Sequence, residues 1–222
     1  MRIALLSKEL RECALYACLA LLVQIHYLGA GMGLPLIPFL DAGRGFEIPF
    51  LANNNSGRET TFTMIVIVAA IAFGLHQSVW ESWRQTALFL LHRPLPQSQI
   101  FLTKLAAGGL LLLGVSALPL LVYSLWAATP GTHASPFFWG MTDSWWRSVG
   151  IAVICYLGAF LTGIRPARWL GSRTWPLIAS VVLALGLKYA PIWPALIYVG
   201  FAGLAAGLIG LIIDTAQRRE YP

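Results

Sequence analysis

Charged residues are scarce in this chain of 222 residues: only 11% are Asp, Glu, Lys or Arg, whereas 58% are hydrophobic. The mean hydropathy is +0.71. A soluble domain carries roughly 25% charged residues, so these few charges cannot cover a water-exposed surface of ordinary area. Lipid must therefore be the solvent for most of the outside. The composition predicts one polytopic membrane domain over residues 1–222.

Signatures of catalytic or metal chemistry are missing as well. The sequence contains no GxxxxGK[ST] nucleotide-binding motif, no HExxH zinc motif and no CxxC pair. No Asp or Glu lies well inside an expected span, which argues against an intramembrane hydrolase and against an ion-coupled pump. We therefore expect no metal and no cofactor in this chain.

Three further absences narrow the possibilities. The net charge of +6 comes from basic residues scattered over short loops, so nucleic acid is not an expected partner. His26 and His76 fall at different depths of their spans, at 1.5 Å per residue, which argues against a haem held between them. The cysteines Cys13, Cys18 and Cys155 are expected to be buried small apolar side chains.

Long uncharged runs are what the sequence does contain. A spanning helix needs about 20 apolar residues. Six segments qualify approximately: 13–34, 62–80, 105–127, 148–164, 174–190 and 192–213. The fourth and fifth are short and could form a kinked hairpin, so five or six spans remain open, and Lys188 in the fifth could snorkel to the interface. The expected fold is an all-α polytopic membrane protein with about six transmembrane helices.

The distribution of Lys and Arg predicts the orientation. If the N-terminus is cytoplasmic, four of the 15 basic residues fall outside and the others inside. The four are Arg44, Arg58, Arg147 and Lys188. Because cytoplasmic loops carry the excess of positive charge, we expect both termini in the cytoplasm of a multi-pass protein of the plasma (cell inner) membrane.

Residues 1–12 predict an amphipathic helix lying at the membrane interface. Hydrophobic residues recur there at helical spacing, and Lys8, Glu9 and Glu12 point in other directions. The alternative is a simple continuation of the first spanning helix. The glycine-rich string 29–33 follows no strand and is interpreted as the end of that helix, not as a phosphate loop.

Glycines form a stripe along one face of the last run. They are Gly200, Gly203, Gly207 and Gly210, at spacings of three, four and three. Small residues let helices approach closely in lipid. The stripe predicts either helix packing within the chain or a subunit interface.

The most distinctive segment is ESWRQTALFLLHRPLPQSQIFLTK, residues 81–104. It is a polar, proline-bearing insert between two membrane-length apolar runs, so it must lie at a membrane face. Pro94 disfavours helix at the residue before it, and Ser98 can cap a new helix that leads into the third span. We expect a short cytoplasmic helix tied rigidly to two spanning helices, with a passive connector as the alternative.

This segment resembles the one that follows the second span in permease subunits of the ABC-2 class of ABC transporters. The matching residues are Glu81, Thr86, Leu90, Leu91, Pro94, Ile100 and Lys104. Gln85 stands where glycine is usual, and Pro96-Gln97 stand where Ser-Arg is usual. The match covers about a tenth of the chain, while the expected layout of spans and termini resembles the family over nearly all of it.

The resemblance implies a permease subunit and, by analogy with the family, one that takes part in export. Such a subunit pairs with a second permease copy or paralogue and with two cytoplasmic ABC ATPase subunits. ATP and Mg would bind those ATPases, and this chain itself would not be an enzyme. Residues 81–104 would act as the coupling helix, and the residues implied in coupling also include Arg84 and Arg93.

A different class of function uses the same segment. A membrane anchor or scaffold without transport activity could recruit a soluble partner through residues 81–104. Among substrates, the uncharged interior suits lipids, hydrophobic peptides or drugs better than ions.

Overall fold

A computed structural model describes residues 2–34, 50, 52–84, 97–132, 136–165 and 172–218 of the chain. Within these ranges the protein is helical and contains no strand, which confirms the expected all-α class. The helices are α1 (Arg2–Gly31), α2 (Ala52–Arg84), α4 (Gln97–Ala128), α5 (Asp143–Ile164), α6 (Trp175–Lys188) and α7 (Pro194–Arg218). A short 3-10 helix, η2 (Trp139–Thr142), leads into α5.

Five of the described helices are long and apolar enough to cross a membrane, as a multi-pass membrane protein requires. The fourth expected segment is one of them, since its apolar helical stretch runs over 26 residues from Trp139 to Ile164. The fifth is not, because α6 has 14 residues. At 1.5 Å per residue, α6 spans about 21 Å, less than the ~30 Å of a hydrocarbon core.

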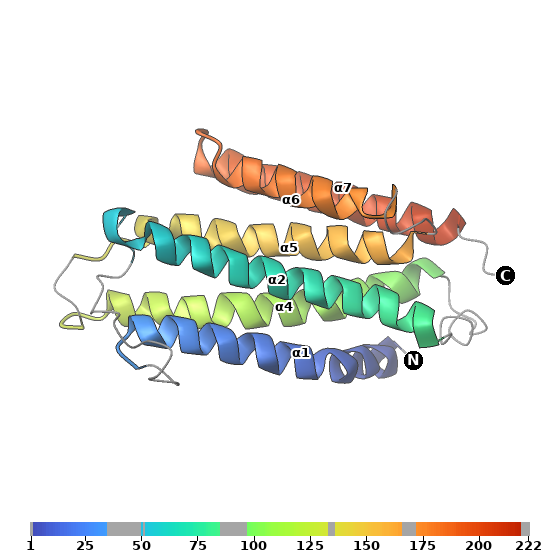
Figure 1. Ribbon diagram of the computed structural model, residues 1–222, viewed down its shortest axis with the longest axis horizontal. Helices are drawn as coiled ribbons and strands as arrows, with labels where there is room; N and C mark the ends of the chain where they lie inside the picture. The colour runs from blue at the N-terminus through green and yellow to red at the C-terminus, as the bar shows by residue number, and fades with distance from the viewer. Residues whose placement is uncertain are drawn as a thin grey trace.

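Helices that follow one another along the chain run antiparallel, and they are arranged in three tiers (Figure 1). One tier holds α1 and α4, the middle tier holds α2 and α5, and the third holds α6 and α7. The start of α1 and the end of α7 lie at the same end of the bundle, called the termini end below. Helix α5 is central: 83% of its apolar stretch is buried inside the protein, against 17% for the apolar stretch of α7.

Helix α1 is continuous from Arg2 to Gly31, with no break at residue 12. The separate interfacial helix expected over residues 1–12 is therefore replaced by the alternative, a continuation of the first span. No Pro or Gly precedes Gly29 in this stretch, so nothing in the sequence interrupts the helix.

The C-terminus of α1 has the glycine-dependent geometry that its sequence predicted. Gly33 has a φ of 78°, in the left-handed region. The Leu34 N–H donates to the Gly29 carbonyl at 2.8 Å, and the Gly33 N–H donates to the Ala30 carbonyl at 3.2 Å. This is a Schellman motif, which closes the orphan carbonyls of a helix end. The glycine string is a helix terminus.

Candidate functional site

The segment singled out by the sequence is rooted in two helices at the termini end. Glu81 and Arg84 belong to the last turn of α2, and Ile100 and Lys104 belong to the first two turns of α4 (Figure 1). The other expected coupling residues lie outside the described residues, as do the side chains of Glu81 and Arg84. They are Thr86, Leu90, Leu91, Arg93 and Pro94.

Lys104 does not lie on the partner-facing surface where the sequence placed it. Its side chain is 2% exposed, and its Nζ lies 3.5 Å from Oε1 of Glu9, which is 1% exposed. Ile100 is buried as well. Because α4 already begins at Gln97, Lys104 is two turns inside the helix, where α1 packs against it. A buried ammonium is tolerated there because a carboxylate faces it.

Gln77 and Tyr156 extend this contact across the bundle. The Tyr156 hydroxyl of α5 donates to Oε1 of Gln77 at 2.7 Å. The Gln77 Nε2 donates to the Lys104 carbonyl at 3.4 Å. Helices α1, α2, α4 and α5 thus meet in one buried group of polar side chains, Glu9, Gln77, Lys104 and Tyr156. We call it the termini-end polar layer.

Gly108 gives this layer its room. A Cβ at this position would collide with Oε1 of Gln77 and the hydroxyl oxygen of Tyr156, whereas the neighbouring Gly109 faces open space. Only glycine at 108 lets the Gln77–Tyr156 hydrogen bond form against α4. Gly108, one of many glycines in the apolar runs of the sequence, therefore sets the geometry of the layer.

A second polar cluster lies at the opposite end of the bundle, around Lys188. Its Nζ lies 2.8 Å from Oε1 of Glu59. It donates to Thr63 Oγ1 at 2.7 Å and to Ser148 Oγ at 2.9 Å. The expected snorkelling of Lys188 is wrong, since its side chain is 1% exposed. We call Glu59, Thr63, Ser148 and Lys188 the Lys188 cluster.

The short length of α6 explains this burial. Lys188 is the last residue of α6, and the helix is packed against α5 at that end. The ammonium therefore needs partners within the protein, and α2 and α5 supply them. The guanidinium of Arg147 strengthens the junction: it pairs with Asp143 and donates to the Lys188 carbonyl at 3.2 Å. Tyr198 of α7 joins through a 2.9 Å hydrogen bond to Asp143.

The Lys188 cluster has a structural role and not a catalytic one. A serine hydroxyl beside a lysine amine is a known nucleophile–base arrangement. However, Ser148 is 0% and Thr63 is 2% exposed, so no substrate reaches either hydroxyl while the helices stay packed. What the cluster does is hold α2, α5 and α6 together.

Histidines and cysteines form no comparable centre. The rings of His76 and Tyr16 lie side by side, with centroids 4.2 Å apart. Across the described ranges, no three His, Cys, Asp or Glu side chains group as a metal site would require. Cys13 and Cys155 are buried as expected, but Cys18 is exposed on α1, which corrects the expectation for that residue.

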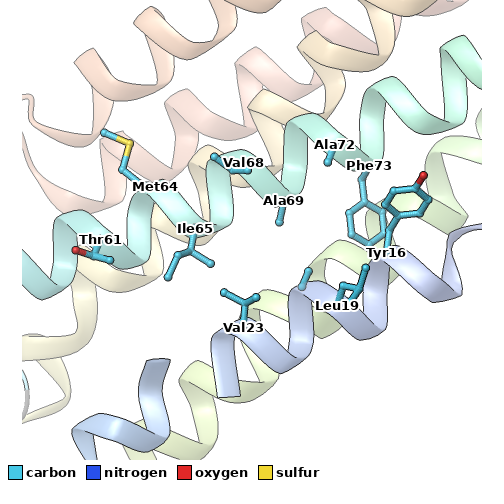
Figure 2. A pocket seen from close by; sticks show the side chains of 11 residues that line it. Tyr16, Leu19, Val23, Thr61, Met64, Ile65, Val68, Ala69, Ala72 and Phe73 are labelled. Carbon is cyan, nitrogen blue, oxygen red and sulfur yellow. The ribbon is translucent and has the colours of Figure 1, made fainter. Parts of the chain in front are cut away.

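An apolar groove of about 420 Å³ separates α1 from α2. Figure 2 shows Tyr16, Leu19 and Val23 of α1 facing the α2 side chains across it. The α2 side is lined by Thr61, Met64, Ile65, Val68, Ala69, Ala72 and Phe73. An opening of this composition, on membrane-spanning helices, admits hydrocarbon and not ions.

No protein-family model, no curated protein and no solved structure matches this chain. The geometry above is therefore the basis for any functional conclusion.

Sequence reasoning missed the residues that make both clusters. Glu9 is expected on the polar side of an interfacial helix, and Glu59 lies before the expected second span, 62–80. Gln77 is the one signal that was available, because an amide in an apolar run usually needs a partner within the bundle. Its partner could not be named from the sequence, since Tyr156 is 79 residues away.

Proposed function

We propose that this protein is the membrane-spanning permease subunit of an ATP-driven transporter of the ABC-2 class. In this proposal residues 81–104 lie in the cytoplasm, both termini are cytoplasmic, and the plasma membrane houses the complex. A separate ATPase subunit binds ATP and Mg and seats the 81–104 segment. A second permease copy or paralogue completes the assembly, which exports its substrate.

The observation that carries this proposal is the position of the termini-end polar layer. The layer joins Gln77 of α2, just before the segment, to Lys104 of α4, the last residue of the segment. A displacement of residues 81–104 would move the ends of α2 and α4. Through Glu9 and Tyr156, the same displacement would reach α1 and α5. Packed helices transmit such small shifts because they are not freely deformable.

The α1–α2 groove supports an apolar substrate. Its lining is almost wholly hydrocarbon, and it is part of the surface that lipid surrounds. A displacement passed to α1 and α2 would change the width of this groove. Lipids or other hydrophobic molecules therefore fit the proposal better than ions.

The alternative function is that of an anchor that recruits a soluble partner through residues 81–104 and transports nothing. The buried polar contacts that join α1, α2, α4 and α5 in the termini-end polar layer are not needed for a docking loop. They are useful where a loop has to move helices, which is why we favour the permease.

Co-purification from gently solubilised membranes tests the proposal first. We expect a stoichiometric ATPase carrying GxxxxGK[ST] to elute with the tagged full chain. Glu81→Lys or Arg84→Glu should lose the ATPase or its ATP-driven transport while membrane insertion stays intact. Lys8→Glu, a charge reversal on the α1 surface at the same end, is the matched control and should keep both.

Two outcomes would contradict the permease. If another soluble protein without the motif elutes in place of an ATPase, the chain is an anchor. If an ATPase elutes but both charge reversals at residues 81 and 84 leave transport unchanged, the segment is not the coupling element.

A further inference from the structure

A second groove, of about 480 Å³, runs along the outer tier between α5, α6 and α7. Gly203 and Gly207 of α7 form part of its wall, opposite Ala179, Ser180 and Leu183 of α6. The added Cβ of Gly200 would meet Leu187 of α6, whereas Gly203, Gly207 and Gly210 face open space. In-chain packing therefore accounts for Gly200 alone, and the other three glycines are left facing outward.

The interior of this groove is apolar although it contains hydroxyls. Ser180 donates to the Pro176 carbonyl at 2.6 Å, and Thr215 donates to the Leu211 carbonyl at 2.7 Å. Both hydroxyls are thus satisfied by their own helices. Leu161, Leu204, Leu208 and Leu211 supply much of the remaining lining.

The termini end of the groove is different, because Arg165 lines it. Among the described residues its guanidinium makes one hydrogen bond, from NH1 to the Ser172 carbonyl at 3.2 Å, and no ion pair with a carboxylate. A guanidinium has five N–H donors, so most of them remain available. The N-terminus of α6 begins beside it at Trp175, and its partial positive charge also favours an anion.

We propose that the α5–α6–α7 groove binds one anionic phospholipid, with its phosphate at Arg165 and an acyl chain along Gly203 and Gly207. Its wall on α7 runs from Gly203 to Thr215, which is about 18 Å at 1.5 Å per residue. One leaflet contributes about half of a ~30 Å hydrocarbon core, so the groove is about as long as one leaflet is deep. Trp175, 63% exposed, lines the groove together with Arg165, and tryptophan is favoured at the level of lipid headgroups.

The dimensions favour a lipid over a helix of a second copy. A helix is about 10 Å across with its side chains, so only part of one could enter this groove. A single hydrocarbon chain is much thinner. The pairing of an apolar trough with a basic mouth also matches an amphiphile with an anionic head, a recognised feature of lipid sites between helices. Asp214, exposed on α7, is not part of the lining.

Native mass spectrometry of the full, detergent-purified protein tests this site. Phosphatidylglycerol and phosphatidylcholine of equal chain length are added as competing probes. We expect wild type to retain phosphatidylglycerol about fivefold better, the preference that one basic side chain near the headgroup provides. Arg165→Gln should lose the preference, whereas Arg11→Gln, an exposed arginine on α1, should keep it.

The groove itself is tested with glycine variants. Gly207→Leu should displace both lipids, because it fills the trough without a clash inside the chain. Gly210→Leu, which also faces open space but does not line the groove, is the matched control and should bind lipid like wild type.

Four outcomes would overturn the proposal. Arg165→Gln could keep the headgroup preference, or Gly207→Leu could bind lipid like wild type. Inorganic phosphate could displace phosphatidylglycerol at equal concentration, in which case the site recognises phosphate and not a lipid. Wild type could instead be a dimer that Gly207→Leu converts to a monomer with lipid binding unchanged, which would assign the glycines to self-association.

Discussion

The two buried lysines of this protein differ in the distance between the ammonium nitrogen and its paired carboxylate. Lys188 has a carboxylate 2.8 Å away and hydrogen bonds to two hydroxyls. Lys104 has its carboxylate at 3.5 Å. Both ammonium groups are almost fully buried. The same residue type thus makes a tight junction at one end of the bundle and a longer contact at the other.

The difference matches the position of each pair relative to residues 81–104. The longer pair lies at the end from which that segment emerges, and the tighter cluster lies at the far end. If the segment moves α2 and α4 as proposed, the Lys188 cluster would act as the fixed end. The Glu9–Lys104 pair would then be the contact that adjusts. The predictions below test this contrast by unfolding the purified protein in detergent.

Lys188→Met should give the largest loss of stability. It removes the salt bridge to Glu59, whose side chain is 24% exposed, together with the hydrogen bonds to two buried hydroxyls, and breaking a buried pair costs about 3–5 kcal/mol. The free energy of unfolding from a denaturant titration measures the loss. Lys8→Met is the control, since the exposed Lys8–Glu12 pair contributes only about 0.3–0.5 kcal/mol. Equal losses for both variants would remove the distinction between buried and exposed pairs.

Lys104→Met should cost less, at the lower end of the same range, about 3 kcal/mol. The Glu9–Lys104 contact is longer than the one at Lys188, so less attraction is lost. The double variant Glu9→Met, Lys104→Met removes both charges and should recover part of the loss. A loss for Lys104→Met that exceeds that for Lys188→Met would invert the assignment of the fixed end.

Gly108→Ala should cost about 1–3 kcal/mol, because the new methyl group has to displace Gln77 and Tyr156. Gly109→Ala is the matched control, and it should be neutral or slightly stabilising, since it faces open space. Comparable thermal midpoints for the two variants would show that the polar layer does not depend on Gly108.

Tyr156→Phe should have the smallest effect, about 0.6 kcal/mol, the average for hydrogen bonds between membrane helices. It removes the bond to Gln77 but keeps the ring that packs against Phe160. The informative readout is transport, if an ATPase partner is found: the variant should reduce ATP-driven transport more than it reduces stability. Full transport in this variant would exclude the Gln77–Tyr156 bond from the coupling route.

The periodicity of the chain was enough to predict most of its helices. The ends of the helices were harder to predict, since α2 extends from Ala52 to Arg84, well beyond the expected span 62–80. The charged and polar residues in these added turns supply Glu59 to the Lys188 cluster. They lie outside the expected span because polar residues shorten an apolar stretch, although a helix can continue through them when another helix provides partners.

The candidate coupling site was located in part. Its position between the second and third spans follows from the alternation of apolar and polar segments. The role of Lys104 did not follow, because a lysine at the edge of an apolar run can turn to water as easily as inward. Only the packing of α1 against α4 selects the inward direction.

By itself, the sequence determined that lipid surrounds this protein and that its backbone is helical. These properties depend on local composition, and every backbone group in lipid has to be satisfied within its own helix. The tertiary structure decided which polar side chains meet. Thr63 and Lys188 are 125 residues apart, and Gln77 and Tyr156 are 79 apart. A helical period fixes the direction of a side chain around its own axis, but not which distant helix lies on that side.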